Sequence, residues 1–138
     1  MLTRLRRVPA GKTHCMQKIL VIDDDSVTLK VLPALLRGRL PDMMIDTASN
    51  AQDALAAVQQ RRYDLIFIDV HMPGMDGLTF LRRLRTYAQD SRILVFTGDV
   101  NESLEAEASE AGAYGFLTKP AFPDLIIAKV RAALRRTP

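Results

Sequence analysis

The sequence predicts an α/β protein built on a five-stranded parallel sheet. Five short apolar segments, rich in β-branched residues, Leu and Phe, alternate strictly with five segments of helical periodicity. This alternation is typical of a parallel sheet with helices on both faces, because each parallel strand pair needs a crossover connection. The chain has 138 residues, 48% hydrophobic and 25% charged, which fits one globular domain.

The predicted strands are short, and most are apolar without alternation, as expected for strands buried on both faces. They comprise residues 18–22, 43–48, 65–68, 93–96 and 114–117. The clearest is Leu65–Ile68, which ends directly at Asp69.

Each apolar segment is followed by a predicted helix. The helices span residues 26–37, 50–60 (with Ser49 or Asn50 as the cap), 77–87, 101–111 and 123–135. In the first, Val27, Val31 and Leu35 recur at helical spacing, and Pro33 predicts a kink or an offset start. The fourth has Leu104 as its only strongly apolar residue, so we expect an exposed helix.

The net charge of +3 comes from the N-terminus. Residues 1–17 hold four basic residues and no acid, whereas 18–138 hold 15 basic and 16 acidic residues. We interpret 1–17 as a basic, disordered arm and 18–138 as the domain; Met16 as the true first residue is an alternative. The single cysteine, Cys15, excludes an internal disulfide and agrees with a cytoplasmic location. No apolar run approaches the ~18 residues of a membrane span, so we expect no membrane contact. We also expect no contact with nucleic acid by the domain itself.

Polar residues fall at the ends of four predicted strands. Asp23 and Asp24 follow the first strand, Asp69 the third, Thr97 the fourth and Lys119 the fifth. The carboxyl ends of parallel strands meet at one edge of the sheet, where sites in open α/β sheets form. We therefore expect these five side chains to converge.

Their chemistry indicates a metal-assisted nucleophile. Three adjacent carboxylates repel one another unless a proton or a cation lies between them. Hard oxygen ligands favour Mg²⁺ or Mn²⁺. A carboxylate beside a metal, a hydroxyl and an ammonium can form an acyl phosphate, with Thr97 and Lys119 stabilising charge on the phosphoryl oxygens.

Five sequence blocks stand out by their order and spacing: ILVIDDD at 19–25, DLIFIDVHMPGMDGL at 64–78, ILVFTGD at 93–99, AGAYGF at 111–116 and LTKP at 117–120. Together they resemble the receiver domain of bacterial two-component response regulators. The resemblance covers residues 18 to about 136. It implies a flavodoxin-like, doubly wound (βα)5 fold with strand order 2-1-3-4-5.

The resemblance also implies an acceptor and a metal site. Asp69 matches the aspartate that is phosphorylated in the family. Asp23 and Asp24 match the acidic pair that holds Mg²⁺ or Mn²⁺ together with Asp69. The backbone carbonyl of His71 matches the remaining protein ligand to that metal.

Further positions match the family's response to phosphorylation. Thr97 and Phe116 resemble the switch residues, and Lys119 resembles the lysine that contacts the phosphoryl group. Lys119–Pro120 matches a frequent cis peptide. The implied donor is a sensor histidine kinase or a phosphotransfer protein, and the implied output is a downstream protein target or an output domain in a longer chain. We expect a monomer or a phosphorylation-dependent dimer, with no enzymatic activity beyond its own phosphorylation and slow autodephosphorylation.

Two alternatives stay open. A haloacid-dehalogenase-like phosphatase also uses a strand-end aspartate, but it places a second aspartate two residues later, where this chain has His71. Its nucleophile usually follows the first strand rather than the third. The other alternative is a degenerate receiver that binds partners without being phosphorylated, and the full set of five site residues argues against it.

Overall fold

The structure is a computed structural model that describes residues 16–98 and 101–135. Its sheet consists of β1 (Gln17–Ile22), β2 (Met43–Ala48), β3 (Leu65–Ile68), β4 (Arg92–Thr97) and β5 (Gly115–Thr118). All neighbouring strands are parallel, in the order β2-β1-β3-β4-β5. The predicted strand order is confirmed, and it places β1, β3 and β4 at the centre of the sheet.

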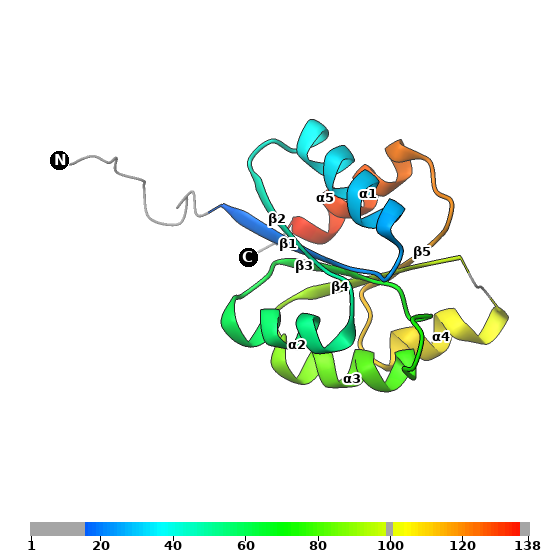
Figure 1. The fold of residues 1–138 in the computed structure, drawn as a ribbon. Helices are drawn as coiled ribbons and strands as arrows, with labels where there is room; N and C mark the ends of the chain where they lie inside the picture. Colours follow the sequence, from blue (N-terminus) through cyan, green and yellow to red (C-terminus); the bar gives the residue numbers. More distant parts are fainter. Residues whose placement is uncertain (1–15, 99–100, 136–138) are drawn as a thin grey trace.

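Helices cover both faces of this sheet. They are α1 (Ser26–Arg39), α2 (Ala51–Gln60), α3 (Gly77–Tyr87), α4 (Glu102–Glu110) and α5 (Pro123–Leu134). Figure 1 shows α1 and α5 on one face and α2, α3 and α4 on the other. Each face has its own apolar cluster, so the predicted doubly wound fold is confirmed.

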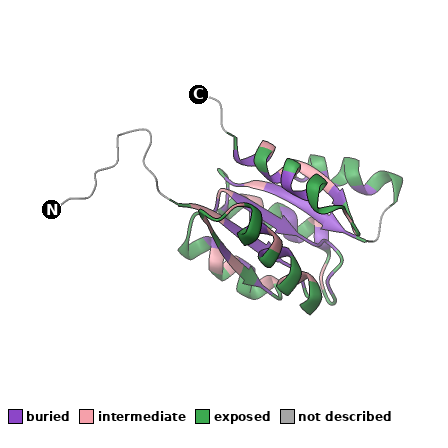
Figure 2. Cartoon of the chain, turned by 90° about the horizontal axis from the view of Figure 1, so that it is seen from above, coloured by how far each residue is buried: buried purple, intermediate pink, exposed green. Residues whose placement is uncertain are grey.

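The central strands divide their side chains between the two clusters. In β1, Ile19 and Val21 face α1 and α5, whereas Leu20 and Ile22 face α2, α3 and α4. All four are at most 1% exposed. Successive strand residues point to opposite faces, so a strand covered on both faces is apolar throughout. Figure 2 shows the resulting buried layer between helices whose outer surfaces are exposed.

The structure corrects the sequence-based view of α1. This helix is continuous from Ser26 to Arg39 with Pro33 inside it, so the offset start is wrong. Val27 and Val31, from the predicted apolar stripe, are 62% and 59% exposed. Leu32 and Leu36 are buried instead, because the segment has apolar residues on more than one side and only one side packs against β1, β2 and α5.

Four helices begin with a side-chain cap. The capping residues of α1 to α4 are Asp25, Asn50, Asp76 and Asn101. Each side chain accepts a hydrogen bond from a backbone N–H in the first turn, which such a turn otherwise leaves without a partner. Since every helix follows a strand, these capped ends lie at the carboxyl edge of the sheet.

Two further expectations concern the chain's ends and surroundings. Most of the predicted arm, Cys15 included, lies outside the described residues, and β1 begins at Gln17, one residue before the predicted domain start. Within residues 16–98 and 101–135, none of the helices has the length and apolar character that a membrane span requires.

Candidate functional site

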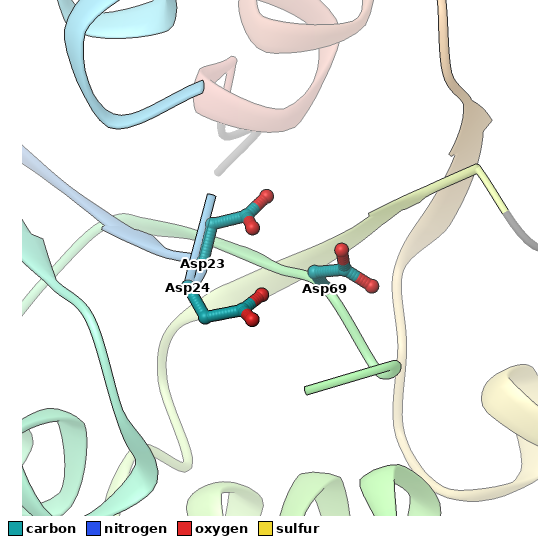
Figure 3. Close-up of side chains that lie close together, drawn as sticks. All are labelled: Asp23, Asp24 and Asp69. Atoms are coloured by element: carbon teal, nitrogen blue, oxygen red, sulfur yellow. The ribbon is translucent and has the colours of Figure 1, made fainter. Parts of the chain in front are cut away.

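Backbone hydrogen bonds of the sheet position two of the predicted carboxylates. The Asp23 N–H donates to the carbonyl of Ala48, and the Asp69 N–H donates to the carbonyl of Ile22, both at 3.1 Å. The two aspartates therefore follow neighbouring strands, β1 and β3, at the same edge. Asp24 is next in the chain, and oxygens of all three carboxylates lie within 4.8 Å of one another (Figure 3).

Burial makes this carboxylate trio (Asp23, Asp24 and Asp69) unfavourable in the absence of a cation. Asp23 is 2% exposed and Asp69 is 8% exposed, whereas Asp24 is open to solvent. Burial raises the pKa of Asp23 above its ordinary value of 3.8, although hydrogen bonds from Lys119 and from the Asp25 N–H oppose the shift. Hard oxygens, one of them reachable by water, suit a divalent metal that keeps part of its hydration shell. The trio can therefore hold a metal ion.

Lys119 connects two members of the trio. Its backbone N–H donates to the carbonyl of Thr97 at 2.8 Å. Its Nζ atom donates to Asp23 Oδ2 at 2.6 Å and to Asp69 Oδ2 at 3.2 Å. Burial by itself would lower the pKa of Lys119, but the hydrogen bond to Asp23 and the two negative charges outweigh it and raise the pKa. The predicted cis peptide between Lys119 and Pro120 is confirmed.

The other predicted residues surround Asp69. Thr97 is fully buried at the end of β4, between the strands that lead to Asp69 and Lys119. The His71 N–H donates to Asp69 Oδ1 at 2.8 Å, while the His71 side chain is exposed. Phe116 in β5 is half-buried and packs against the cluster under α2, α3 and α4. All the predicted site residues thus lie in or beside the carboxyl edge of the sheet, and their roles stay predictions.

One site neighbour, Asp25, is not among the residues predicted for the site from the sequence. The Asp25 N–H donates to Asp23 Oδ1 at 2.9 Å, while the Asp25 side chain caps α1. An aspartate three residues before Thr28, at the start of a helical segment, is a capping signal that could have pointed to it.

A comparison with protein families settles what this arrangement belongs to. The model of the response regulator receiver domain matches residues 19–131. The chain is a member of this family. The receiver match spans all five strands from Ile19 onward and includes every predicted site residue.

Two curated proteins are similar to this chain in sequence. The transcriptional regulatory protein ResD of Bacillus subtilis is 34% identical over 86% of this chain and 48% of its own length. The response regulator MprA of Mycolicibacterium vanbaalenii is 35% identical over 87% of this chain and 51% of its own length. This receiver chain thus spans about half the length of these curated relatives.

Solved structures agree in fold. The chemotaxis protein CheY4 of Vibrio cholerae is 29% identical, with a TM-score of 0.79, over 87% of this chain and all of its own. A response regulator protein from Burkholderia pseudomallei, solved with a phosphorylated aspartic acid and a calcium ion, is 29% identical with a TM-score of 0.71. That match covers 84% of this chain and 71% of the other. The CheY4 likeness supports the flavodoxin-like architecture.

Proposed function

We propose that this receiver domain accepts a phosphoryl group on Asp69 in a Mg²⁺-dependent reaction of two-component signalling. One observation carries the proposal. The buried Asp69 carboxylate shares a cluster with two further carboxylates and accepts a hydrogen bond from the Lys119 ammonium at 3.2 Å. A nucleophile, a metal-binding oxygen set and a fixed cation are thereby combined, as phosphoryl transfer to a carboxylate requires.

The protein's own groups orient the nucleophile. Asp69 Oδ1 accepts from the His71 N–H, and Oδ2 accepts from Lys119. In the proposed step, an oxygen of Asp69 attacks the phosphorus of a phosphohistidine, the N–P bond breaks, and histidine leaves. Lys119 and the Thr97 hydroxyl then donate to the phosphoryl oxygens. Mg²⁺ (or Mn²⁺) held by the trio and the His71 carbonyl would neutralise charge on the transferred group.

Phosphorylation would then act as a switch. The phosphoryl group would carry about −1.5 to −2 charges and three strong hydrogen-bond acceptors at Asp69, in place of the single negative charge of the carboxylate. Thr97 ends β4, the strand next to the one that Asp69 follows. β4 also pairs with β5, which contains the half-buried Phe116. We infer that Thr97 and Phe116 pass the change to a partner surface on α4, β5 and α5. Enzymatic activity beyond phosphorylation and slow dephosphorylation of the domain itself is not expected.

An apolar groove beside the site supports a protein as donor. It lies between α1 and the segment after β5, and its lining includes Val27, Val31, Pro120 and Ala121 next to Lys119. Phe122, the following residue, is 82% exposed. A sensor histidine kinase or a phosphotransfer protein with an apolar contact surface could dock here and present its phosphohistidine to Asp69.

The output is either an attached domain or a separate protein. About half of ResD, a transcriptional regulatory protein by name, lies outside the match. We infer that this receiver likewise acts through an output domain in a longer chain or through a downstream protein target. It would do so in the cytoplasm, as a monomer or a phosphorylation-dependent dimer.

Incubation with a small acyl-phosphate donor and Mg²⁺ tests the proposal. Intact-mass measurement should show the gain of one phosphoryl group in the wild type and none in Asp69→Asn, because the amide is not a nucleophile of this kind. Chelation of the metal should slow the gain. A wild type that gains no mass under short incubations and a series of metals would refute the phosphoacceptor function. Sustained release of inorganic phosphate would favour the phosphatase alternative.

As the pH falls, Mg²⁺ binding should begin to weaken at a higher pH than it would if Asp23 had the pKa of an ordinary aspartate. Because burial raises the pKa of Asp23, the folded protein binds a proton that the unfolded chain does not in the range just above 3.8. The contribution of Asp23 to folding stability is therefore lost as the pH rises through that range. A divalent cation bound to the ionised carboxylate offsets this loss. The rise in Tm caused by Mg²⁺ should shrink as the pH falls from about 7 to about 4. In Asp23→Asn, any remaining rise should depend less on pH in that range.

A further inference from the structure

Two successive turns connect the metal-site carboxylate Asp23 to helix α1. In the first, Asp23 Oδ1 accepts from the Asp25 N–H at 2.9 Å. In the second, Asp25 Oδ1 accepts from the Val27 N–H at 3.0 Å. Asp25 Oδ2 also accepts from the Thr28 hydroxyl at 3.1 Å. Both turns follow the pattern of an aspartate that bonds the N–H two residues later. Asp25 therefore takes part in both turns: its backbone N–H closes the first, and its side chain accepts the hydrogen bond of the second.

The backbone of Asp25 helps to fix the direction of a buried carboxylate. Asp23 is 2% exposed, so solvent has little access to reorient it. One of its oxygens is held by Lys119 and the other by the Asp25 N–H. Lys119 reaches Asp23 through a flexible side chain, whereas the Asp25 N–H is a backbone group. Its place depends on how the chain enters α1, which the Asp25 cap determines.

The Asp25 carboxylate itself is directed at the helix. Both of its oxygens are bonded to the first turn of α1, and Asp25 is exposed. The carboxylate trio that lies within 4.8 Å consists of Asp23, Asp24 and Asp69, without Asp25. A direct role of the Asp25 side chain as a metal ligand is therefore not supported by this geometry.

We propose that Asp25 is a positioning residue for the metal site: its cap on α1 holds the backbone N–H that orients Asp23. The proposal rests on the proposed function, since it assumes that Asp23 serves a divalent cation. In this proposal the third acid of the Asp23–Asp24–Asp25 run has a structural role and is not a metal ligand. The affinity of the site for a metal ion then depends on how the first turn of α1 is capped.

The chain contains a matched control. Asp76 caps α3 with the same set of bonds: Oδ1 accepts from the Leu78 N–H at 3.3 Å, and Oδ2 accepts from the Thr79 hydroxyl at 2.7 Å. Its backbone angles, φ −86° and ψ 108°, are close to those of Asp25, φ −81° and ψ 115°. Asp76→Ala therefore removes an equivalent cap from a different helix.

Three variants test the proposal through two readouts. They are Asp25→Ala, Asp25→Ser and Asp76→Ala. The first readout is protection of the residue-25 amide against hydrogen exchange in the metal-free protein, and the second is the Kd for Mg²⁺ by calorimetry. Asp25→Ala should lose amide protection and weaken Mg²⁺ binding about tenfold, the scale for groups that orient a metal ligand. Asp25→Ser should resemble the wild type, because serine caps helices as well as aspartate does. Asp76→Ala should lower Tm as much as Asp25→Ala and leave the Kd unchanged.

The variants separate the proposal from its rivals. If Asp25→Ser binds Mg²⁺ as weakly as Asp25→Ala, the charge of residue 25 matters rather than its cap, and the proposal is wrong. It is also wrong if Asp25→Ala keeps wild-type amide protection. A wild type that does not bind Mg²⁺ would contradict the proposed function. In that case the exchange readout, which needs no metal, still decides whether the cap holds this turn.

Discussion

Replacing Lys119 by methionine should tighten Mg²⁺ binding and at the same time slow phosphorylation of Asp69 by about 10²-fold. The Lys119 ammonium occupies the trio at 2.6 Å from Asp23 and 3.2 Å from Asp69, so a metal ion must share these carboxylates with a cation already present. Methionine keeps an apolar stem beside the Phe96 ring, over which the ammonium lies at 5.4 Å. Removal of this competing charge should tighten Mg²⁺ binding by about tenfold. The phosphoryl group meanwhile loses a donor that is aimed at its developing charge, which is worth about 10²-fold in rate.

Calorimetry with Mg²⁺ and the rate of mass gain from an acyl-phosphate donor measure the two effects separately. Lys129→Met, which removes one positive charge from α5, is the control and should change neither value appreciably. Equal Mg²⁺ affinity in wild type and Lys119→Met would show that the ammonium does not compete with the metal. A simultaneous loss of affinity and rate would indicate that Lys119 mainly maintains the fold of the site.

Gly77→Ala should destabilise the protein by about 3 kcal/mol. A Cβ atom at residue 77 would lie 2.6 Å from the carbonyl carbon and the Cβ of Val70, and closer still to the carbonyl oxygen of Val70. Backbone atoms cannot move aside as the end of a flexible side chain can. Val70 directly follows Asp69, so the displacement should also disturb the Asp69 carboxylate. Chemical denaturation measures the first effect, and the rate of phosphorylation measures the second.

Gly38→Ala is the matched control for this prediction. Gly38 lies within α1, and apart from its chain neighbours and the backbone of its own helix no atom comes within 4 Å of the Cβ position there. Alanine is the better helix former, so this variant should be more stable by about 0.5–1 kcal/mol. If Gly77→Ala were as stable as the wild type, the loop between Val70 and α3 would be able to yield, and the close approach would not constrain Asp69.

The sequence allowed the strands to be predicted closely because most of them are short apolar runs between polar residues. The bounds of β2 and β3 agree with the prediction, and β5 is shifted by one residue. The buried face of α1 was harder to predict. Leu32 and Leu36 are buried while Val27 and Val31 are exposed, and periodicity alone could not distinguish these sides because both carry apolar residues. Packing against β1, β2 and α5 decides between them.

The site was predictable for a topological reason. In a parallel sheet every strand ends at the same edge, so residues that are distant in sequence, such as Asp23, Asp69 and Lys119, have to meet there. Contacts that depend on the path of a connection were not predictable in this way. The hydrogen bond from the Asp25 N–H to Asp23 and the groove beside Lys119 both depend on how the chain turns after a strand.

The capped helix ends give this edge of the sheet an electrostatic character of its own. The N-terminus of a helix carries a partial positive charge, and the ends of α1 to α4 follow strands that lead to this edge. Such a setting favours anions and opposes metal binding, so a trio of acids is needed to attract a divalent cation. With Lys119 and that cation present, the three carboxylates would be neutralised. Phosphorylation of Asp69 would then leave about one surplus negative charge, of the sign that the helix ends stabilise.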